Sequence, residues 1–238
     1  MEETGKNPIQ VAERLFQVIE RLAENGPMGI MDLSAELGFH KSTTHRLVTS
    51  LQYMGYIRQD EESLKYALSL KFLEIGSKIL EQTNMASLIH PSLKKLSEQT
   101  GETVHLVRRE GTEAVYIDKV ESTVSSIRMV SRVGSRIPLY CSGVGKALLA
   151  ELPDPEIEDI WNSSEITSLT PYTVTSLSDL MDRIRGVREA GYAMDDEENE
   201  EGVRCIAVSI PDYHKEPVYA LSISAPVSRM TDARIAEL

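Results

Sequence analysis

The stretch GFHKSTTHRLVTSLQYMGYIR, residues 38–58, decides how the first part of the chain folds. Gly38 allows a tight turn, and the residues from Ser42 onward place apolar side chains at helical spacing. These apolar residues are Leu47, Val48, Leu51 and Met54. Gly55 indicates the end of that helix, and residues 56–59 and 64–68 read as two short strands joined by a turn.

Two further helices are expected upstream of this stretch. Asn7 and Pro8 are typical of a helix start, and apolar residues recur after them at a spacing of three or four. These are Ala12, Leu15, Phe16, Ile19, Leu22 and Ala23. A second helix is expected at residues 30–37, before Gly38. Three helices and a hairpin in this order predict a winged helix-turn-helix at residues 7–69.

The third helix carries the chemistry of this first domain. In a helix-turn-helix, the second helix of the pair lies in the major groove and presents its N-terminal side chains to the base edges. The face opposite the apolar residues consists of Lys41, Ser42, Thr43, His45, Arg46 and Thr49. We therefore expect these side chains to bind double-stranded operator DNA. The alternative is a solvated face of a small helical bundle, which the turn and the hairpin argue against.

The net charge of −12 is unusual for a nucleic-acid binder, because phosphate contacts need Lys and Arg. Charge must be read locally, however. Residues 38–58 contain Lys41, Arg46 and Arg58 and no acidic residue, whereas residues 195–201 are strongly acidic. An acidic body would restrict DNA to one face of the protein.

The remainder of the chain predicts a linker helix and an α+β domain. Phe72, Ile75 and Ile79 continue as an amphipathic helix, assigned to a linker at residues 70–85, and a further helix ends before Gly101. Strands are expected at 103–108, 114–120, 125–130, 203–210 and 218–224, and helices at 142–152 and 177–190. Ser176 resembles the cap of the last helix and Gly191 its end.

Four ordered motifs resemble the IclR family of bacterial transcription regulators. They are residues 33–58, PLYCSGVGKALLA at 138–150, GYAMD at 191–195 with the residues up to Ala207, and ALSIS at 220–224. The resemblance spans nearly the whole chain. It implies that residues 86–238 form a sensor domain similar to GAF domains, with an antiparallel sheet flanked by helices. One departure is Ser69, which stands where the family usually has glycine after the wing.

The resemblance also implies that this domain binds a small organic acid. Carried over by motif, the effector-binding residues are Met129, Ile137, Gly143, Val144, Asp195, Cys205, Ser222 and Ser224. Their chemistry suits a hydroxy- or keto-acid, since a helix N-terminus accepts a carboxylate and the polar side chains pair with oxygens. Simpler interpretations are a solvated loop for Asp195, an ordinary strand thiol for Cys205, and serines that face water.

Three other functions fit the sequence less well. A cysteine-dependent enzyme would use Cys141 or Cys205 as nucleophile and His105 as base, but neither cysteine has an activating neighbour apart from Arg204. A metal sensor would need ligand spacings that are absent from the sequence. A phosphate loop at residues 143–146 lacks the required flanking residues. We expect a repressor without catalytic activity, cofactor or bound metal.

Assembly and location follow from apolar surface and composition. The apolar stripe of the first helix, together with the linker, predicts a homodimer, and the resemblance suggests a tetramer formed through the sensor domains. No run of about 18 apolar residues is present, the N-terminus is polar, and the two cysteines form no disulfide framework. A cytoplasmic protein that does not bind membranes is expected.

Overall fold

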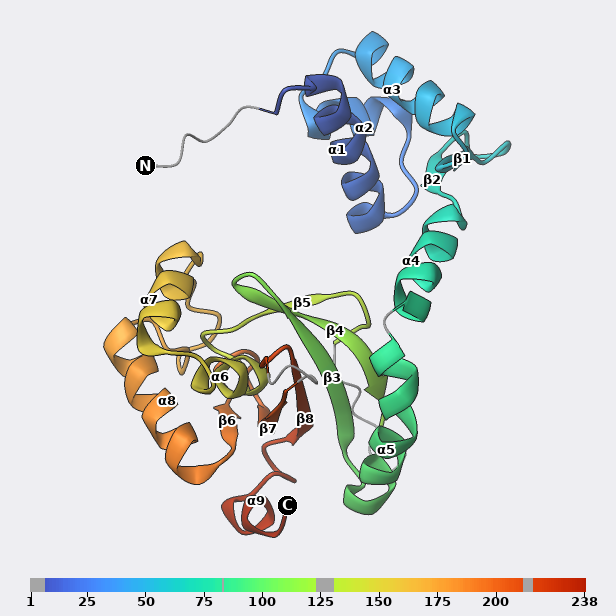
Figure 1. Ribbon diagram of the computed structural model, residues 1–238. Coiled ribbons are helices and arrows are strands. Elements are labelled where there is room, and N and C mark those ends of the chain that lie inside the picture. Colours follow the sequence, from blue (N-terminus) through green and yellow to red (C-terminus); the bar gives the residue numbers. More distant parts are fainter. Residues whose placement is uncertain (1–6, 83, 123–130, 212–215) are drawn as a thin grey trace. The chain divides into compact units, whose positions relative to one another are not determined.

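The computed structural model describes residues 7–82, 84–122, 131–211 and 216–238. The chain divides into two compact units, Met1–Gln82 and Thr83–Leu238 (Figure 1). Met129 and the predicted strand at 125–130 lie outside the described residues. Within the described ranges, none of the helices is long and apolar enough to span a bilayer.

The first unit has the predicted order of helices and hairpin. Its described elements are α1 (Gln10–Asn25), α2 (Ile30–Leu37), α3 (Lys41–Tyr53), β1 (Ile57–Gln59), β2 (Tyr66–Leu68) and α4 (Lys71–Gln82). Gly38 ends α2 in the left-handed conformation, with φ of 65°. The helix start predicted at Asn7 is wrong by three residues. Asn7 Oδ1 accepts the Ile9 N–H at 2.9 Å and closes a turn before α1 begins.

The core of the first unit lies between the three helices and the hairpin. It contains Val18, Leu22, Met28, Leu33, Leu47, Val48, Leu51, Ile57 and Tyr66. The predicted buried face of α3 is confirmed except at Met54, which follows the helix and is 39% exposed. Thr44, which lies among the apolar positions, is fully buried, and its hydroxyl donates to the His40 carbonyl. The opposite side of α3 is therefore the side that solvent or a partner can reach.

The second unit is built on a six-stranded sheet in the order β5-β4-β3-β8-β7-β6. Its strands are β3 (Thr103–Glu110), β4 (Glu113–Val120), β5 (Arg136–Pro138), β6 (Ala193–Asp196), β7 (Val203–Ile210) and β8 (Tyr219–Pro226). Every pair of neighbouring strands is antiparallel. This arrangement confirms the predicted α+β domain with an antiparallel sheet.

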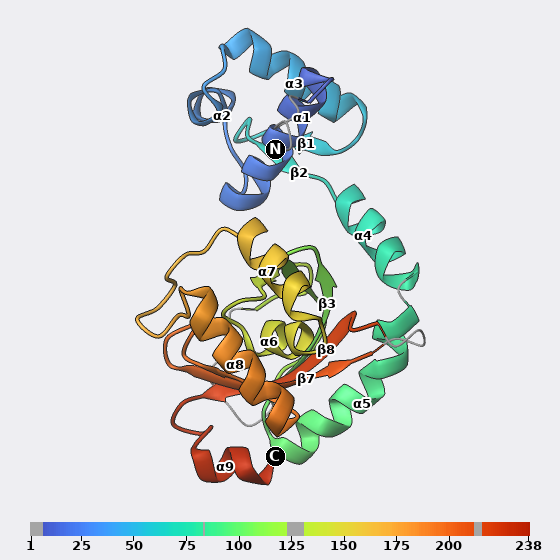
Figure 2. The same cartoon turned by 60° about the vertical axis from the view of Figure 1, so that its left-hand side comes forward.

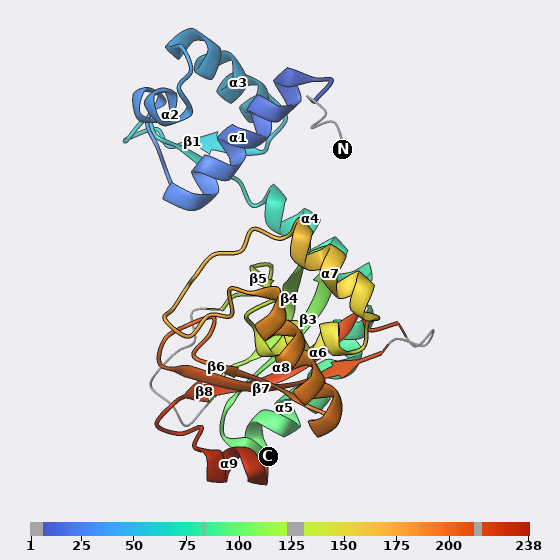
Figure 3. The same cartoon turned by 90° about the vertical axis from the view of Figure 1, so that its left-hand side faces the viewer.

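Helices cover both faces of the sheet, as Figures 2 and 3 show from two sides. The helices are α5 (Asn84–Thr100), α6 (Gly143–Ala150), α7 (Asp154–Ser163), α8 (Leu177–Ala190) and α9 (Asp232–Glu237). One core lies between the sheet and α6, α7 and α8, and another lies on the side of α5 and α9. Because side chains alternate along a strand, Val107 belongs to the first core and Leu106 to the second.

The sequence misses three elements of this unit, namely β5, β6 and α7. Asp195 lies on β6, so the interpretation of its surroundings as a solvated loop is wrong. The predicted cap of α8 is confirmed, because Ser176 Oγ accepts the Asp179 N–H at 3.1 Å. Gly191 ends that helix with φ of 80°.

Candidate DNA-binding surface and effector site

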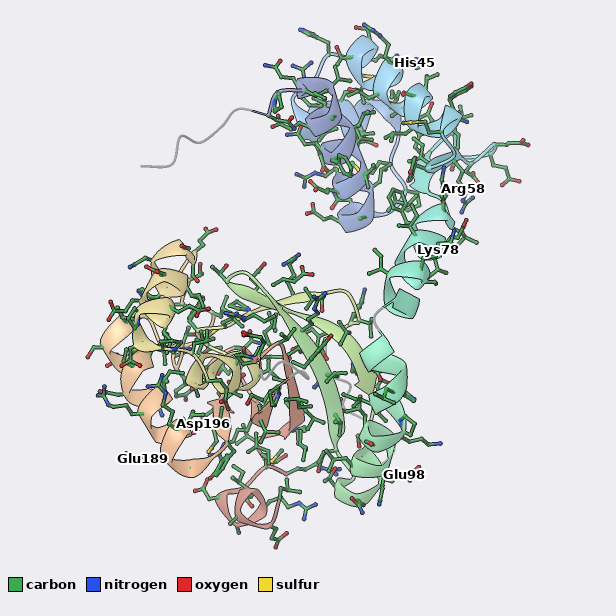
Figure 4. All side chains as sticks on the ribbon, in the orientation of Figure 1. His45, Arg58, Lys78, Glu98, Glu189 and Asp196 are labelled. Atoms are coloured by element: carbon green, nitrogen blue, oxygen red, sulfur yellow. The ribbon has the colours of Figure 1, made fainter. Side chains whose placement is uncertain are left out.

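The predicted DNA-contacting residues lie together on the outer face of α3. Lys41, Ser42, His45, Arg46 and Thr49 are exposed, and Thr43 is half-buried. Figure 4 shows His45 on the side of α3 that faces away from α1. The helix contains no acidic residue along its length. This face presents cations and hydroxyl groups, which suit phosphate oxygens and base edges, without a carboxylate to repel them.

The wing, which is the hairpin of β1 and β2, carries negative charge, in contrast to the outer face of α3. Asp60 Oδ1 accepts hydrogen bonds from the Ser63 N–H at 2.9 Å and the Ser63 hydroxyl at 2.7 Å, which closes the turn between β1 and β2. Glu61 and Glu62 are exposed at its tip. The tip is therefore unsuited to phosphate contacts, whereas the outer face of α3 carries side chains that suit DNA.

The start of α4 is fastened to the end of α3. Ser69 Oγ donates to the Gly55 carbonyl at 2.6 Å, and Lys71 Nζ donates to the Met54 carbonyl at 2.7 Å. The Lys71 ammonium also lies 4.3 Å from the centroid of the Tyr56 ring, which in turn lies 5.2 Å from the Phe72 ring. Ser69, which stands where the family usually has glycine, thus attaches the linker helix to the end of α3.

In the second unit, most of the predicted effector residues meet on one face of the sheet. Asp195 pairs with Cys205, and Cys205 pairs with Ser224, so these three side chains form a row across β6, β7 and β8. The next row contains Ala207, Ser222 and His105. Directly paired residues share a face, and Val107 and Ala207 place this face against α6.

The N-terminus of α6 lies against these rows. A Cβ atom added at Gly143 would lie 3.4 Å from the Asp195 nitrogen and 3.5 Å from the Ala207 Cβ. Ser142 Oγ accepts the Gly145 N–H at 3.1 Å. The N–H groups of Gly143 and Val144, in the first turn of the helix, have no intrahelical acceptor. They are available to an anion at the sheet surface.

A glycine is needed at position 145 because α6 begins close against the backbone of Leu139, in the segment that precedes it. A Cβ atom there would lie 2.2 Å from the Leu139 carbonyl oxygen, closer than any two such atoms can come. Ile137 is buried on β5, at the opposite edge of the sheet from β6. The structure therefore groups Gly143, Val144, Asp195 and the strand residues, and it places Ile137 further along the same core.

The polar members of this group are buried. Asp195 is 4% exposed, and Ser222 and Ser224 are each 3% exposed, so the interpretation of the serines as facing water is wrong. Asp195 Oδ1 accepts the Glu198 N–H at 2.8 Å and the Asn199 N–H at 3.3 Å. Burial nevertheless raises the pKa of Asp195 to about 7, against the opposing effect of the nearby Lys146 ammonium. Asp195 is therefore partly protonated near neutral pH.

Two residues of this site went unrecognised as binding groups in the sequence. His105 is buried, and its Nδ1 lies 3.4 Å from Ser222 Oγ and 3.3 Å from Ser224 Oγ. Lys119 is paired with His105 across β3 and β4, and its side chain is 9% exposed. Strand alternation could have placed His105 on the inner face, but the strand order that brings it beside β8 has no local signal.

A buried ion pair supports the same site from α6. Lys146 Nζ forms a hydrogen-bonded ion pair with Glu198 Oε1, and both side chains are almost inaccessible. The Glu198 backbone carbonyl accepts the Thr173 hydroxyl at 2.6 Å. Because Glu198 also donates its N–H to Asp195, the pair connects α6 to the loop that orients the Asp195 carboxyl. Lys146 thus has a structural partner and no free ammonium for a phosphate.

The cysteines have the wrong environment for nucleophiles. Burial raises the pKa of Cys141 to about 12, and it raises the pKa of Cys205 further, with Asp195 acting in the same direction. A catalytic thiol needs a lowered pKa and a nearby cation. Among the described residues, no group of three or more His, Cys, Asp or Glu is arranged to hold a metal ion. The environment of the two thiols therefore gives the cysteine-dependent enzyme no support.

Two cavities of the second unit can be compared with this site. One of about 390 Å³ lies on the α5 and α9 side of the sheet and is lined mainly by apolar residues, including Leu96, Ile223 and Ile235. Another, of about 260 Å³, is lined by Lys146, Glu198 and residues of α8. The apolar cavity offers no charged side chain to an organic acid. The buried polar rows beneath α6 are chemically the better candidate.

A winged helix-turn-helix with an acid-free outer face, joined to a sheet domain with a buried polar site, defines a DNA-binding transcription regulator. The family model described as the IclR helix-turn-helix domain matches residues 11–61, and the model described as the bacterial transcriptional regulator IclR C-terminal matches residues 77–238. The chain belongs to the IclR family of bacterial transcription regulators, as its motifs predict.

Known relatives agree with this assignment. The acetate operon repressor of Salmonella typhimurium is 37% identical over 233 residues, covering 97% of this chain and 85% of that protein. The transcriptional regulator KdgR of Escherichia coli is 37% identical over 234 residues, covering 98% and 89%. The crystal structure of the Thermotoga maritima IclR superposes with a TM-score of 0.79 at 32% identity, covering 96% of this chain and 92% of that one.

Proposed function

We propose that this protein is a repressor whose affinity for operator DNA is set by a small organic acid bound beneath α6. The observation that carries the proposal is the combination of an exposed, acid-free α3 with a buried polar site in a separate unit. Several relatives are named as repressors, which supports the direction of control. The domains we assign are residues 7–69 for DNA, 70–85 for the linker and 86–238 for the effector.

On DNA, the side chains of α3 divide into two roles. Arg46, His45 and Thr43 lie on the outer face and would contact base edges, where a well-placed bidentate contact contributes about 1–3 kcal/mol of discrimination. Lys41 lies at the helix N-terminus and would contact a phosphate, which positions the helix without reading sequence. Ser42 and Thr49 complete the contact surface.

In the sensor site, the effector would be a hydroxy- or keto-acid. Its carboxylate would accept from the N–H groups of Gly143 and Val144 and from the hydroxyls of Ser222 and Ser224. Asp195, whose pKa is raised to about 7, can be protonated and can then donate to a second oxygen of the ligand. Cys205 would add to the wall, and the resemblance to the family adds Ile137 and Met129 as further predicted contacts. The two thiols, with raised pKa values, have no catalytic role, and we place the protein in the cytoplasm.

The assembly we propose is a dimer of DNA-binding units. Phe16 on α1 is 60% exposed, and Leu73 and Ile79 on α4 are 66% and 60% exposed. Burial of such side chains between two copies contributes roughly 1.5–3 kcal/mol each. A dimer would match a pseudo-palindromic operator, and pairing through the sensor units would give a tetramer. Light scattering at micromolar concentration tests this, and a monomer would contradict it.

The decisive experiment selects operator DNA and then measures coupling. Sites are selected from random duplexes with the full-length protein, and a panel of metabolite acids is screened by thermal shift. Calorimetry then measures effector binding with and without operator. Coupling between two sites is reciprocal, so operator must change effector affinity by the same factor by which effector changes operator affinity. Binding of an acid that leaves operator affinity unchanged would reject the regulatory role.

A further inference from the structure

His105 occupies the centre of the polar cluster on the inner face of the sheet. Its Nδ1 is shared between two hydroxyls, Ser222 Oγ at 3.4 Å and Ser224 Oγ at 3.3 Å. Its Nε2 lies 2.8 Å from Ser131 Oγ, in the segment that follows β4. The ring also packs against Tyr116, with the ring centroids 5.1 Å apart. Each nitrogen of the imidazole therefore has hydroxyl partners among the described residues.

The surroundings keep this imidazole neutral. Burial lowers the pKa of His105 to about 3, and the nearby Lys119 ammonium acts in the same direction. A neutral imidazole carries one proton, so one nitrogen donates and the other accepts. The position of that proton decides what Ser222 and Ser224 can offer to a ligand.

The geometry of the shared contact indicates which nitrogen carries the proton. One N–H can be shared between two acceptor oxygens in a three-centre bond, for which nearly equal and somewhat long distances are expected. A bare nitrogen has a single lone pair in the ring plane, and two hydroxyls would compete for it. The similar distances to Ser222 and Ser224 fit the shared N–H, whereas the shorter contact to Ser131 fits a hydroxyl that donates to a bare Nε2.

We propose that His105 sets the hydrogen-bond polarity of the effector site by holding its proton on Nδ1 and donating it to Ser222 and Ser224. Neither serine hydroxyl then has to donate to His105, so both can act as donors to a ligand. Such a site selects an acceptor with two oxygens, namely a carboxylate. This inference rests on the proposed effector site. It makes His105 a positioning residue that acts through the two serines.

Lys119 holds the segment on the other side of His105. Its Nζ donates to the Ser131 carbonyl at 2.8 Å and to Glu121 Oε1 at 3.1 Å, so the ammonium lies on the side of His105 that faces the Ser131 segment. The Glu121 carboxylate balances its charge, and Lys119 therefore fixes the partner of Nε2 and adds no unpaired cation to the site. The preference for an acid rests on the donor hydroxyls.

The test reads the tautomer directly and needs neither ligand nor DNA. Solid-state NMR of the full-length protein, labelled with ¹⁵N in histidine, distinguishes a protonated from a bare ring nitrogen. The His105 signals among the five histidines are identified by their loss in His105→Asn. We expect Nδ1 protonated and Nε2 bare at neutral pH. A proton on Nε2, or on both nitrogens, would overturn the proposal whatever the effector proves to be.

Two variants then test the consequence for binding. The amide nitrogen of His105→Asn occupies a position close to that of Nδ1 and can still donate to the serines, whereas the longer His105→Gln places its amide near Nε2. With 2-oxobutyrate and its primary amide as probes, the wild type should prefer the acid. His105→Asn should keep that preference, and His105→Gln should weaken binding of the acid by about tenfold.

The outcomes separate this inference from the proposed function. Near-UV circular dichroism establishes that both variants are folded. Equal acid affinity in wild type and folded His105→Gln would overturn the role of His105 while leaving the effector site in place. If neither probe binds the wild type, 2-oxobutyrate lies outside the range of effectors, and the NMR result still decides the tautomer.

Discussion

The DNA-binding surface and the effector site place their polar groups in opposite environments. On α3, Lys41, His45 and Arg46 are exposed and are positioned by a helix whose other face is packed. In the proposed effector site, Asp195 and His105 are buried, and both depend on hydrogen bonds within the protein, Asp195 to the N–H of Glu198 and His105 to the hydroxyl of Ser222. Solvent satisfies the first group, and the fold must satisfy the second, because an unpaired buried polar group costs about 1–3 kcal/mol.

This difference determines how function and folding are related in the two units. On the proposed function, a substitution on the outer face of α3 would remove a contact to DNA and leave the folded chain unchanged. A substitution in the effector site removes a contact on which the fold itself depends. The predictions below follow this contrast, from substitutions that act through folding to those that act at the surface.

The largest effect is expected when the buried ion pair is broken. Lys146→Met leaves the Glu198 carboxylate buried without its counter-ion, which should lower the free energy of unfolding of the second unit by about 3–5 kcal/mol. Chemical denaturation followed by circular dichroism measures the loss. The double variant Lys146→Met with Glu198→Met should recover much of it, because no charge is then left buried.

The matched comparison is Arg46→Met, which also replaces a cation by methionine but at an exposed position. Its free energy of unfolding should stay within about 0.5 kcal/mol of the wild type. Equal destabilisation by Lys146→Met and Arg46→Met would remove the distinction between the two regions.

The second prediction concerns pH. The unfolded chain ionises Asp195 above its ordinary pKa of 3.8, whereas the folded protein keeps the proton until about pH 7. Between these values the folded state binds more protons, so this residue's contribution to the free energy of unfolding falls as the pH rises. The loss from pH 4 to pH 8 should be about 2–4 kcal/mol, relative to Asp195→Asn, which has no proton to release.

Urea denaturation of both proteins across this range measures the difference in slope. Other titrating groups are common to the two proteins and cancel in the comparison. Parallel curves for wild type and Asp195→Asn would show that the Asp195 carboxyl ionises as it does in the unfolded chain.

The third prediction concerns DNA. Arg46→Ala should weaken binding to the selected operator by about 1–3 kcal/mol and relax specificity at one base pair, without altering stability or effector binding. The charge-matched control is Lys95→Ala, an exposed lysine on α5 in the second unit. Fluorescence anisotropy against operator and scrambled duplexes measures both. An operator affinity unchanged by Arg46→Ala would exclude α3 as the base-reading helix in the orientation that we propose.

The same contrast explains what the sequence could predict. The bounds of α2 and the buried face of α3 follow from local signals, namely Gly38 and apolar spacing, which act within a few residues. The sequence of α7 is mostly polar and shows no apolar spacing typical of a helix, since Ile157 is its one fully buried side chain among the described residues. Local signals therefore serve the first unit well and the second unit less well.

The prediction of the effector site depended on the resemblance to the family, because local sequence patterns do not show which strands are neighbours. Asp195 stands in an acidic run that is typical of a loop, and it is buried because α6 packs over a four-residue strand. His105 meets Ser222 across 117 residues of sequence, through a strand order that no local pattern specifies. The resemblance to the family is what places the serines among the expected effector residues, whereas spacing alone shows only that they share a strand face.

The smallest effect is expected at Ser69, where the linker helix α4 follows the DNA-binding domain. Ser69 is not among the residues with positive φ, so its backbone has no need of the glycine that the family usually has there. Its hydroxyl donates to the Gly55 carbonyl at 2.6 Å and fastens α4 to the end of α3. Ser69→Ala removes that hydrogen bond and should lower the free energy of unfolding of the first unit by about 0.5–1.5 kcal/mol.

Ser69→Gly should cost about 0.4–1 kcal/mol more than Ser69→Ala, because glycine adds backbone freedom to the unfolded chain. Ser69→Thr keeps the hydroxyl and serves as the control. Because α4 connects the two units, a looser attachment should also reduce the factor by which the effector changes operator affinity, in the order Thr, Ala, Gly. Calorimetry of the three variants with operator measures that factor. If stability falls in this order while the factor stays constant, Ser69 stabilises the first unit but does not transmit the signal between the units.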